Sequence, residues 1–536
     1  MIRYEEERLP LIPRPKIRWI PTRVLVALMM FTACWTNYMC RLQMPILAVP
    51  MIKALPGNHT EGVCKDETSR MRRALSLVDP GAYLEDYILE DQLESSQDAA
   101  DQIRNIRLPR EAVKTRNPDE PIQLFNGSPF EWGPGVRGQL IAAYSYGNVP
   151  GNFLGGIMAV RWGPKKAILW TSVLAAFTSL ISPILAQLHW GVLLFSRIVI
   201  GITGGVTFPA CHTLVAKWAP PNEKARFVWS LLGGTFGTIL TYPMVAGIAD
   251  NMNWENGWYI PSLLMILWIV FWALLTYDSP AEHPGITEEE KEYILSSQVG
   301  TVRTQKPTLR EMPLKEIFTS IPFISLVLCH FGNIFLLFFY QNSMMLYLTK
   351  ALGFQLTKGG MAAGLPWAGR MFFGFFFSWA GDTAKRKGLV SITVLRKGAT
   401  IFSHLLPGIF LILVGYVGCR FVLANVFLIL ALGFNGAASI SNLSNNQDLS
   451  PNFAGFLYGI MNTVGSASGM IISPLVEEIA GKYGNPIDRW QTLFWIGSAV
   501  CIVCMVVFLI GGSGNIQSWN EIRPKEDTER GERRND

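Results

Sequence analysis

The chain has 536 residues, of which 50% are hydrophobic and 16% charged, with a formal net charge of +6. A soluble protein of this size carries roughly 25% charged residues, so the composition excludes an ordinary soluble enzyme and favours a polytopic membrane protein. The basic residues lie in short tails and loops rather than in one stripe, which argues against nucleic acid as a partner.

The first element is a polar, basic N-terminal tail, residues 1–23, which we expect to be cytosolic. Within it, Glu7, Leu11 and Ile12 fit an acidic dileucine sorting signal read by adaptor proteins, although an ordinary solvated tail explains the same residues. The apolar run that follows is too long for the core of a cleavable signal peptide, so we expect it to be retained as a membrane span.

Twelve segments are long and apolar enough to cross a bilayer, which needs roughly 20 helical residues per span. Their expected positions are 24–52, 136–158, 167–187, 190–216, 227–249, 256–277, 322–349, 357–380, 399–418, 421–446, 453–478 and 490–512. They divide into an N-terminal six-helix half, 24–277, and a C-terminal six-helix half, 322–512. A cytosolic central loop, 278–321, joins the halves, and a cytosolic tail, 513–536, follows them.

Charge and sequons predict the orientation. Arginines and lysines concentrate in the tails and in the loops after the second and eighth spans, which the positive-inside rule places in the cytosol. The long loop 53–136 then lies in the lumen or outside the cell, and the glycosylation sequons at Asn58 and Asn126 agree with this. Only Cys64 of the eight cysteines lies in that loop, so we expect no disulfide framework.

Glycine pairs recur at equivalent places in the two halves. Gly233 and Gly237 lie in the fifth span, and Gly465 and Gly469 in the eleventh. Small residues four apart let helix backbones approach closely, and close packing is the interpretation we favour. Two parallel six-span repeats predict an all-α membrane protein with the layout of major facilitator transporters, whose substrate site lies at the midplane between the halves.

Arg41, Arg197 and Arg370 lie inside expected spans that contain no carboxylate to pair with them. An arginine at the centre of a membrane costs roughly 2.5–3.5 kcal/mol, so it is rarely kept without a partner or a wet cavity. We therefore expect a small anionic substrate to be the partner. The alternative for Arg41 and Arg197 is that the side chains reach the membrane interface.

Uncharged polar residues supply a second set of candidates. Tyr144, Asn333, Tyr340 and Asn442 could line a wet substrate path, or could instead form interhelical hydrogen bonds. Asn442 recurs at helical spacing with Asn435 and Ser439, which predicts one shared face. His330 could carry a coupled proton, although a lone intramembrane histidine is more often structural.

No metal-ligand cluster, phosphate loop or catalytic triad is apparent in the sequence, so we expect neither an enzyme nor a bound cofactor beyond a co-transported sodium ion or proton. In the central loop, Thr287 and Glu290 predict a capping box at the start of a short helix.

Several long motifs identify a family resemblance. The segments GGVTFPACHTLVAKWAPPNEKAR, DSPAEHPGITEEEKEYI and NNQDLSPNFAGFLYGIMNTVGSASGM are similar to those of the anion:cation symporters, which include sialin, the vesicular glutamate transporters and the sodium-phosphate cotransporters. The resemblance implies roles in anion binding for Arg41 and Arg197. It also shows departures from those family members. Gly204 stands at the position of a glutamate tied to proton coupling, Ile141 at the position of a histidine, and Asn333 at the position of an arginine. Arg370 has no counterpart that we recognise in those members.

The sequence therefore predicts a monomeric secondary active transporter of an organic or inorganic anion, driven by sodium or by the membrane potential, in a lysosomal, vesicular or plasma membrane. Two alternatives remain open. One is a non-transporting receptor or scaffold on a transporter fold, in which the long loop binds a partner. The other is proton-coupled export of an organic anion from lysosomes.

Overall fold

The computed structural model describes residues 21–53, 129–220, 227, 229–298 and 313–520. The sorting signal at Glu7, Leu11 and Ile12 and the sequons at Asn58 and Asn126 lie outside these ranges and stay predictions.

Helices of the N-terminal half follow the expected spans. They are α1 (Thr22–Met51), α5 (Pro134–Arg161), α6 (Pro164–Leu188), α7 (Trp190–Trp218), α9 (Gly233–Asn251), which the short turn η3 (Trp229–Leu232) precedes, and α10 (Asn256–Leu275). The connection to the second half contains η4 (Pro280–Glu282), α11 (Glu288–Gln298) and α12 (Leu314–Thr319).

The C-terminal half contains longer stretches broken by irregular turns. They are α13 (Ile321–Leu346) with η5 (Tyr347–Ala351), α14 (Leu356–Arg386), α15 (Ile392–Thr400) with η6 (Ile401–Leu405) and α16 (Leu406–Tyr416), α17 (Phe421–Asn435) with η7 (Gly436–Ile440) and α18 (Asn442–Leu449), α19 (Ala454–Ile479), η8 (Gly481–Tyr483), α20 (Ile487–Gly511) and η9 (Ser518–Asn520).

Nine helical stretches among the described residues are long and apolar enough to cross a membrane. Three more, α1, α5 and α14, have 30, 28 and 31 residues and carry more polar residues and glycines. Their length exceeds the roughly 20 residues that a span needs. These three helices also hold much of the candidate site, where a polar face is expected.

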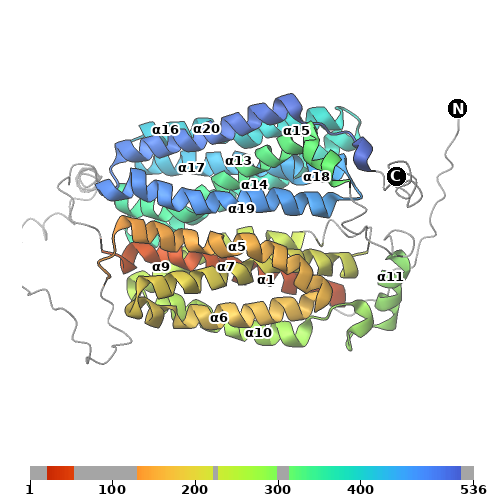
Figure 1. Ribbon diagram of the computed structural model, residues 1–536, viewed down its shortest axis with the longest axis horizontal. Helices are drawn as coiled ribbons and strands as arrows, with labels where there is room; N and C mark the ends of the chain where they lie inside the picture. The colour runs from red at the N-terminus through yellow and green to blue at the C-terminus, as the bar shows by residue number, and fades with distance from the viewer. Residues whose placement is uncertain (1–20, 54–128, 221–226, 228, 299–312, 521–536) are drawn as a thin grey trace, which may run out of the picture.

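Figure 1 shows the helices in two bundles, with α1, α5, α6, α7, α9 and α10 in one and α13 to α20 in the other. We call the end where α1 ends and α5 begins the loop side, and the opposite end, where α1 starts, the terminus side.

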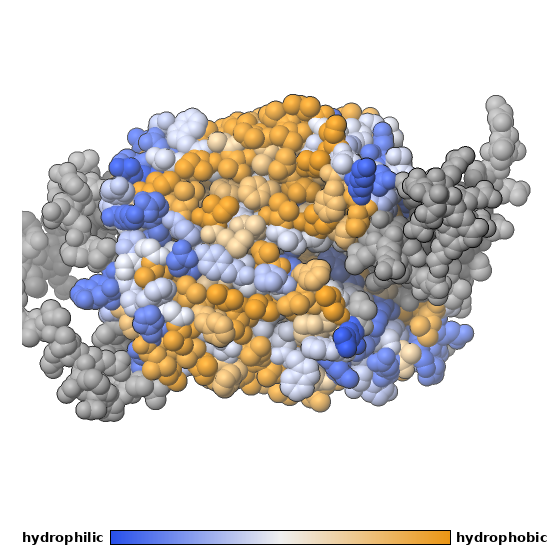
Figure 2. Space-filling model, viewed as in Figure 1, coloured by the Kyte–Doolittle hydropathy of each residue, from blue (hydrophilic) through white to orange (hydrophobic). Residues whose placement is uncertain are grey.

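An apolar belt covers the middle of the visible face, and hydrophilic residues gather at both ends (Figure 2). Such a belt fits a lipid bilayer, because Phe153, Phe372 and Ile510 are 72%, 70% and 79% exposed.

The glycine pairs mediate close packing, as expected. A side chain at Gly233 would overlap the Phe31 carbonyl of α1, and one at Gly469 would overlap the Ser145 hydroxyl and Phe338. Gly237 and Gly465 likewise lie against Trp35 and Ile334. The fifth span therefore packs on the first, and the eleventh on the seventh, which is the same relation in both halves.

The ninth span begins at Ile392, earlier than the expected residue 399, because a buried ion pair lets charged residues continue the helix. Arg396 Nε donates to Asp448 Oδ2 at 2.6 Å, and the side chains are 9% and 10% exposed. Asp448 lies in α18, so the same pair extends the tenth span.

The expected capping box is half right. The Glu290 amide donates to the Thr287 hydroxyl at 3.3 Å, but the Glu290 carboxylate turns away from its own helix. It accepts hydrogen bonds from the amides of Thr22 and Arg23 and from the Arg23 guanidinium. Since the first amides of a helix have no internal partner, Glu290 caps α1 and fixes α11 to the N-terminal half.

The expectation about cysteines was wrong in one respect. Cys34, Cys40, Cys211, Cys329, Cys501 and Cys504 are buried free thiols, as expected for packing residues. Cys419, on the loop side between α16 and α17, is disulfide-bonded.

Candidate substrate-binding site

Arg41 lies where the two halves meet. Its Cζ is 4.0 Å from the ring centre of Phe338 on α13, and 5.3 Å from those of Tyr38 and Tyr144 in its own half. Among the described residues, its buried Nε and Nη2 atoms have no hydrogen-bond partner. An aromatic cage holds the charge in place without using the donors, so these donors are available to an acceptor that enters between the halves.

Arg197 is fully buried and points toward the backbone of α1. Its Nη1 and Nη2 donate to the carbonyls of Cys40 and Arg41, both at 3.0 Å. The Arg41 carbonyl is free because Pro45, four residues further on, has no amide hydrogen to donate to it. Arg197 therefore satisfies an acceptor that the proline leaves open, and it holds the stretch of α1 that carries Arg41.

Tyr144 and Asn37 complete the cluster in the N-terminal half. The Tyr144 hydroxyl donates to Asn37 Oδ1 at 3.1 Å, and Asn37 Nδ2 donates to the Gly204 carbonyl at 2.7 Å. A side chain at Gly204 would overlap the Tyr144 hydroxyl, while Gly201 packs against the Tyr144 backbone. The glycines of α7 thus serve close helix packing, and the space beside Gly204 is filled by Tyr144.

A second cluster lies in the C-terminal half. Arg370 Nε donates to Asn435 Oδ1 at 3.1 Å, and Asn435 Nδ2 donates to Asn333 Oδ1 at 2.9 Å. Arg370 is only partly buried, and Tyr38 and Tyr458 lie near enough to act on its charge. Because Tyr38 is also beside Arg41, the space between the halves has a guanidinium from each half near it.

Asn442 and His330 form a pair next to this cluster, in which Asn442 Nδ2 donates to His330 Nδ1 at 2.9 Å. The predicted common face holds for Asn435 and Asn442, which both bond to α13 at Asn333 and His330, although η7 and Ser441 interrupt the helix between them. Ser439 instead bonds to Ser378 of α14.

Tyr340 is not brought into either cluster. Its side chain is fully buried, and its hydroxyl donates to the Leu428 carbonyl of α17 at 3.0 Å.

Residues that the sequence did not single out also contribute, namely Phe338 and Tyr458. Phe338 carries no charge and lies in none of the quoted motifs, and Tyr458 does not stand out within the family-like segment that contains it. Both act through their position between the halves.

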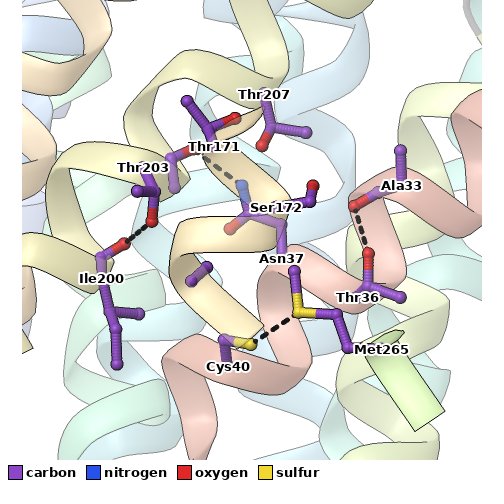
Figure 3. Close-up of a pocket in the computed structure, with 12 residues that line it drawn as sticks. Ala33, Thr36, Asn37, Cys40, Thr171, Ser172, Ile200, Thr203, Thr207 and Met265 are labelled. Atoms are coloured by element: carbon purple, nitrogen blue, oxygen red, sulfur yellow. Dashed lines mark hydrogen bonds between the residues drawn. The ribbon is translucent and has the colours of Figure 1, made fainter. Parts of the chain in front are cut away.

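A small polar cavity lies inside the N-terminal half beside the first cluster. Thr36, Asn37, Thr171, Ser172, Thr203 and Thr207 line it (Figure 3). Its volume is about 10 Å³, close to the least that one water molecule needs. The cavity is therefore too small for an organic anion. No group of three or more metal-ligating side chains occurs in the part of the chain that the structure describes.

The halves are joined on the loop side. The Tyr242 hydroxyl of α9 donates to the Gln341 carbonyl at 2.9 Å, and the Thr357 hydroxyl donates to Asp250 at 2.6 Å. Toward the terminus side the ribbons of α5 and α19 diverge (Figure 1), and Gly459 of α19 faces open space. The structure is thus closed on the loop side, where these contacts join the halves.

Comparisons with known proteins agree with this architecture. The sequence profile of the Major Facilitator Superfamily matches residues 121–474. Sialin from Homo sapiens is 30% identical over 407 residues, which are 74% of this chain and 80% of sialin. Vesicular glutamate transporter 3 from Danio rerio is 32% identical over 396 residues, which are 73% of this chain and 66% of that protein.

Solved structures share the fold at low sequence identity. The crystal structure of a D-xylose-proton symporter is similar with a TM-score of 0.58 and 13% identity, covering 92% of this chain and 99% of that one. The crystal structure of a bacterial homologue of the human lysosomal transporter Spinster is similar with a TM-score of 0.56 and 11% identity. The match covers 92% of this chain and 96% of that one. At these identities the likeness shows the fold alone.

Proposed function

The chain belongs to the Major Facilitator Superfamily, as a multi-pass membrane protein related to sialin and the vesicular glutamate transporters, and from this premise we propose that it is a secondary active transporter of a small anion. It is a member of a transporter family and not an enzyme. The observation that carries the proposal is Arg41, whose guanidinium lies between the halves with two buried donors that have no partner among the described residues.

The anion binds between Arg41 of the N-terminal half and Arg370 of the C-terminal half. Arg41 offers Nε and Nη2, while Asn435 orients Arg370 through its Nε. Planar guanidinium groups bind carboxylate or phosphate oxygens in pairs of hydrogen bonds. Because the two arginines come from opposite halves, a bound anion couples the halves, which is what a change of access around a fixed site requires.

Arg197 is a positioning residue in this scheme. Two of its guanidinium nitrogens are occupied by the carbonyls of Cys40 and Arg41, so its contribution to anion binding passes through the conformation of α1. This role differs from the direct anion contact that the family resemblance implies.

Sodium or the membrane potential drives transport. The space beside Gly204, where the resemblance implies a proton-coupling glutamate, is filled by Tyr144, whose hydroxyl would overlap a side chain at that position. Tyr144 itself donates to Asn37 and is neutral at physiological pH.

The loop side faces a lumen or the cell exterior, and the terminus side faces the cytosol. The disulfide at Cys419 supports this, because disulfides persist in oxidising compartments, and Cys419 lies on the loop side. The name of one relative, vesicular glutamate transporter 3, favours a vesicular membrane.

Uptake into proteoliposomes tests the proposal. Labelled phosphate, glutamate, aspartate, sialic acid, urate and ATP are supplied to wild-type protein and to Arg41→Gln. We expect uptake of at least one anion, reduced by about tenfold to a hundredfold in the variant, since a charge-assisted hydrogen bond is worth roughly 1.5–3 kcal/mol. The exposed Arg489, 46% accessible, supplies the control Arg489→Gln, which should transport normally. Equal uptake by the wild type and a folded Arg41→Gln would refute the proposed site.

A further inference from the structure

Arg137 and Glu477 form a buried ion pair across the two halves. Arg137 Nε donates to Glu477 Oε1 at 2.6 Å and Nη2 donates to Oε2 at 2.7 Å, so the two side chains meet through parallel hydrogen bonds. They are 6% and 3% exposed. Arg137 lies at the loop-side start of α5 and Glu477 at the loop-side end of α19, 340 residues apart in the sequence.

The surrounding backbone is shaped around the pair. A side chain at Gly138 would come within 2.9 Å of Glu477 Cγ, and one at Gly481 would overlap Glu477 Oε2. Glycine at both positions lets α5 approach α19 closely enough for the carboxylate to be enclosed. The pair is therefore packed into the seam between the halves, unlike the nearby surface pair of Glu478 and Lys482, which is 64% and 51% exposed.

We propose that Arg137 and Glu477 are the loop-side gate of the transporter, paired when the loop side is closed and separated each time it opens. A buried charge without its partner is strongly unfavourable, whereas water solvates both charges once the helices separate. The pair consequently stabilises the closed state only while both partners are present. This inference goes beyond the proposed function and does not depend on which anion is carried.

Charge around the pair gives the direction of the effect. Lys350, in η5 on the loop side, lies near enough for its charge to interact with that of Arg137. Glu477 neutralises Arg137, so Glu477→Gln leaves the Arg137 charge buried without its partner and next to the like charge of Lys350. Loss of the carboxylate should therefore shift the protein toward the state that is open on the loop side.

Thiol accessibility measures this shift without any transport assay. Ser145 of α5 is 1% exposed and packs against Gly469 of α19, so a cysteine there is covered while the loop side is closed. The variant Ser145→Cys is reconstituted into nanodiscs and its reaction rate with a hydrophilic maleimide is measured, with the parent protein as blank. Glu477→Gln is then added, and Glu478→Gln, which removes the neighbouring exposed carboxylate, is the matched control.

We expect Glu477→Gln to raise the labelling rate at least about tenfold, and Glu478→Gln to leave it unchanged. The exchanged pair Arg137→Glu with Glu477→Arg should return the rate toward that of Ser145→Cys alone, because it restores opposite charges at the same place. If Glu477→Gln fails to fold, the neutral double variant Arg137→Gln with Glu477→Gln replaces it and should also label faster. An unchanged rate in the folded variants, or an equal effect of Glu478→Gln, would overturn the gate.

Discussion

Arg197 donates a hydrogen bond to the backbone carbonyl of Arg41 at 3.0 Å, the carbonyl that Pro45 leaves without a helical partner. One arginine thereby fixes the backbone from which the other reaches into the space between the halves. Two arginines that look equivalent in the sequence have different tasks, and this difference gives the first prediction.

A double-mutant cycle between Arg197 and Pro45 tests the positioning role. Arg197→Leu should lower the melting temperature, because it leaves the Arg41 carbonyl unsatisfied at a cost of roughly 1–3 kcal/mol. Pro45→Ala supplies an amide hydrogen to that carbonyl, so it should recover part of the loss in the Arg197→Leu background. Pro50→Ala, in the same helix, is the control and should recover nothing. Strictly additive effects of Arg197→Leu and Pro45→Ala would contradict the assignment.

The crowding between Gly204 and Tyr144 gives the second prediction. Gly204→Ala places a methyl group on the Tyr144 hydroxyl, and overpacking of this kind costs roughly 1–3 kcal/mol, so the melting temperature should fall. Tyr144→Phe removes the hydroxyl oxygen and should relieve part of the cost in the double variant. The control is Gly156→Ala, since nothing lies within 4 Å of a side chain there. A stable Gly204→Ala would show that the space is not filled by Tyr144.

Asn435 tests the role of Arg370 in substrate binding. Asn435→Asp conserves size but places a carboxylate on Arg370 Nε, so an internal ion pair competes with the anionic substrate. We expect the KM for the transported anion to rise about tenfold, the change that roughly 1.4 kcal/mol produces. Asn251→Asp introduces the same charge at an exposed position and should leave the KM unchanged. An unaltered KM in Asn435→Asp would remove Arg370 from the site.

The long loop between α1 and α5 should be dispensable for transport. Its two ends are held together where the Lys53 amide donates to the Phe130 carbonyl and the Phe130 amide donates to the Met51 carbonyl, both at 2.8 Å. Deletion of residues 68–108 therefore leaves the anchoring contacts intact, and a shorter loop is easier to close. Uptake by the deletion variant should remain within about twofold of the wild type. Loss of flux from a folded deletion variant would favour the receptor alternative.

The sequence alone predicted the two-half architecture and the approximate positions of the helices, because most spans are continuous apolar stretches that need no tertiary information. It also brought Arg41, Tyr144 and Arg370 forward as site residues, since charge and polarity stand out in apolar helices. The partner of Arg197 was not predicted. An arginine inside a membrane suggests an anionic partner. A proline on a neighbouring helix, however, leaves a backbone carbonyl without its helical hydrogen bond, and that carbonyl can accept a hydrogen bond from the arginine instead.

The gate pair was beyond the reach of the sequence for a different reason. Arg137 and Glu477 lie near the ends of two helices in different halves, where a charged residue is ordinarily interpreted as interfacial. Only the packing of α5 against α19 shows that both are buried and paired. In the same way, the interruption of the helix at η7 and Ser441, between Asn435 and Asn442, could not be predicted from the spacing of the polar residues.

The most direct test of the account is the driving force of Arg41-dependent uptake. Proteoliposomes containing wild-type protein or Arg41→Gln receive the labelled anion under a sodium gradient, a membrane potential or a proton gradient, each imposed alone. The account predicts uptake by the wild type with sodium or with the potential, little response to the proton gradient at zero potential, and strong loss in Arg41→Gln. Uptake that requires the proton gradient, or that persists unchanged in a folded Arg41→Gln, would contradict it.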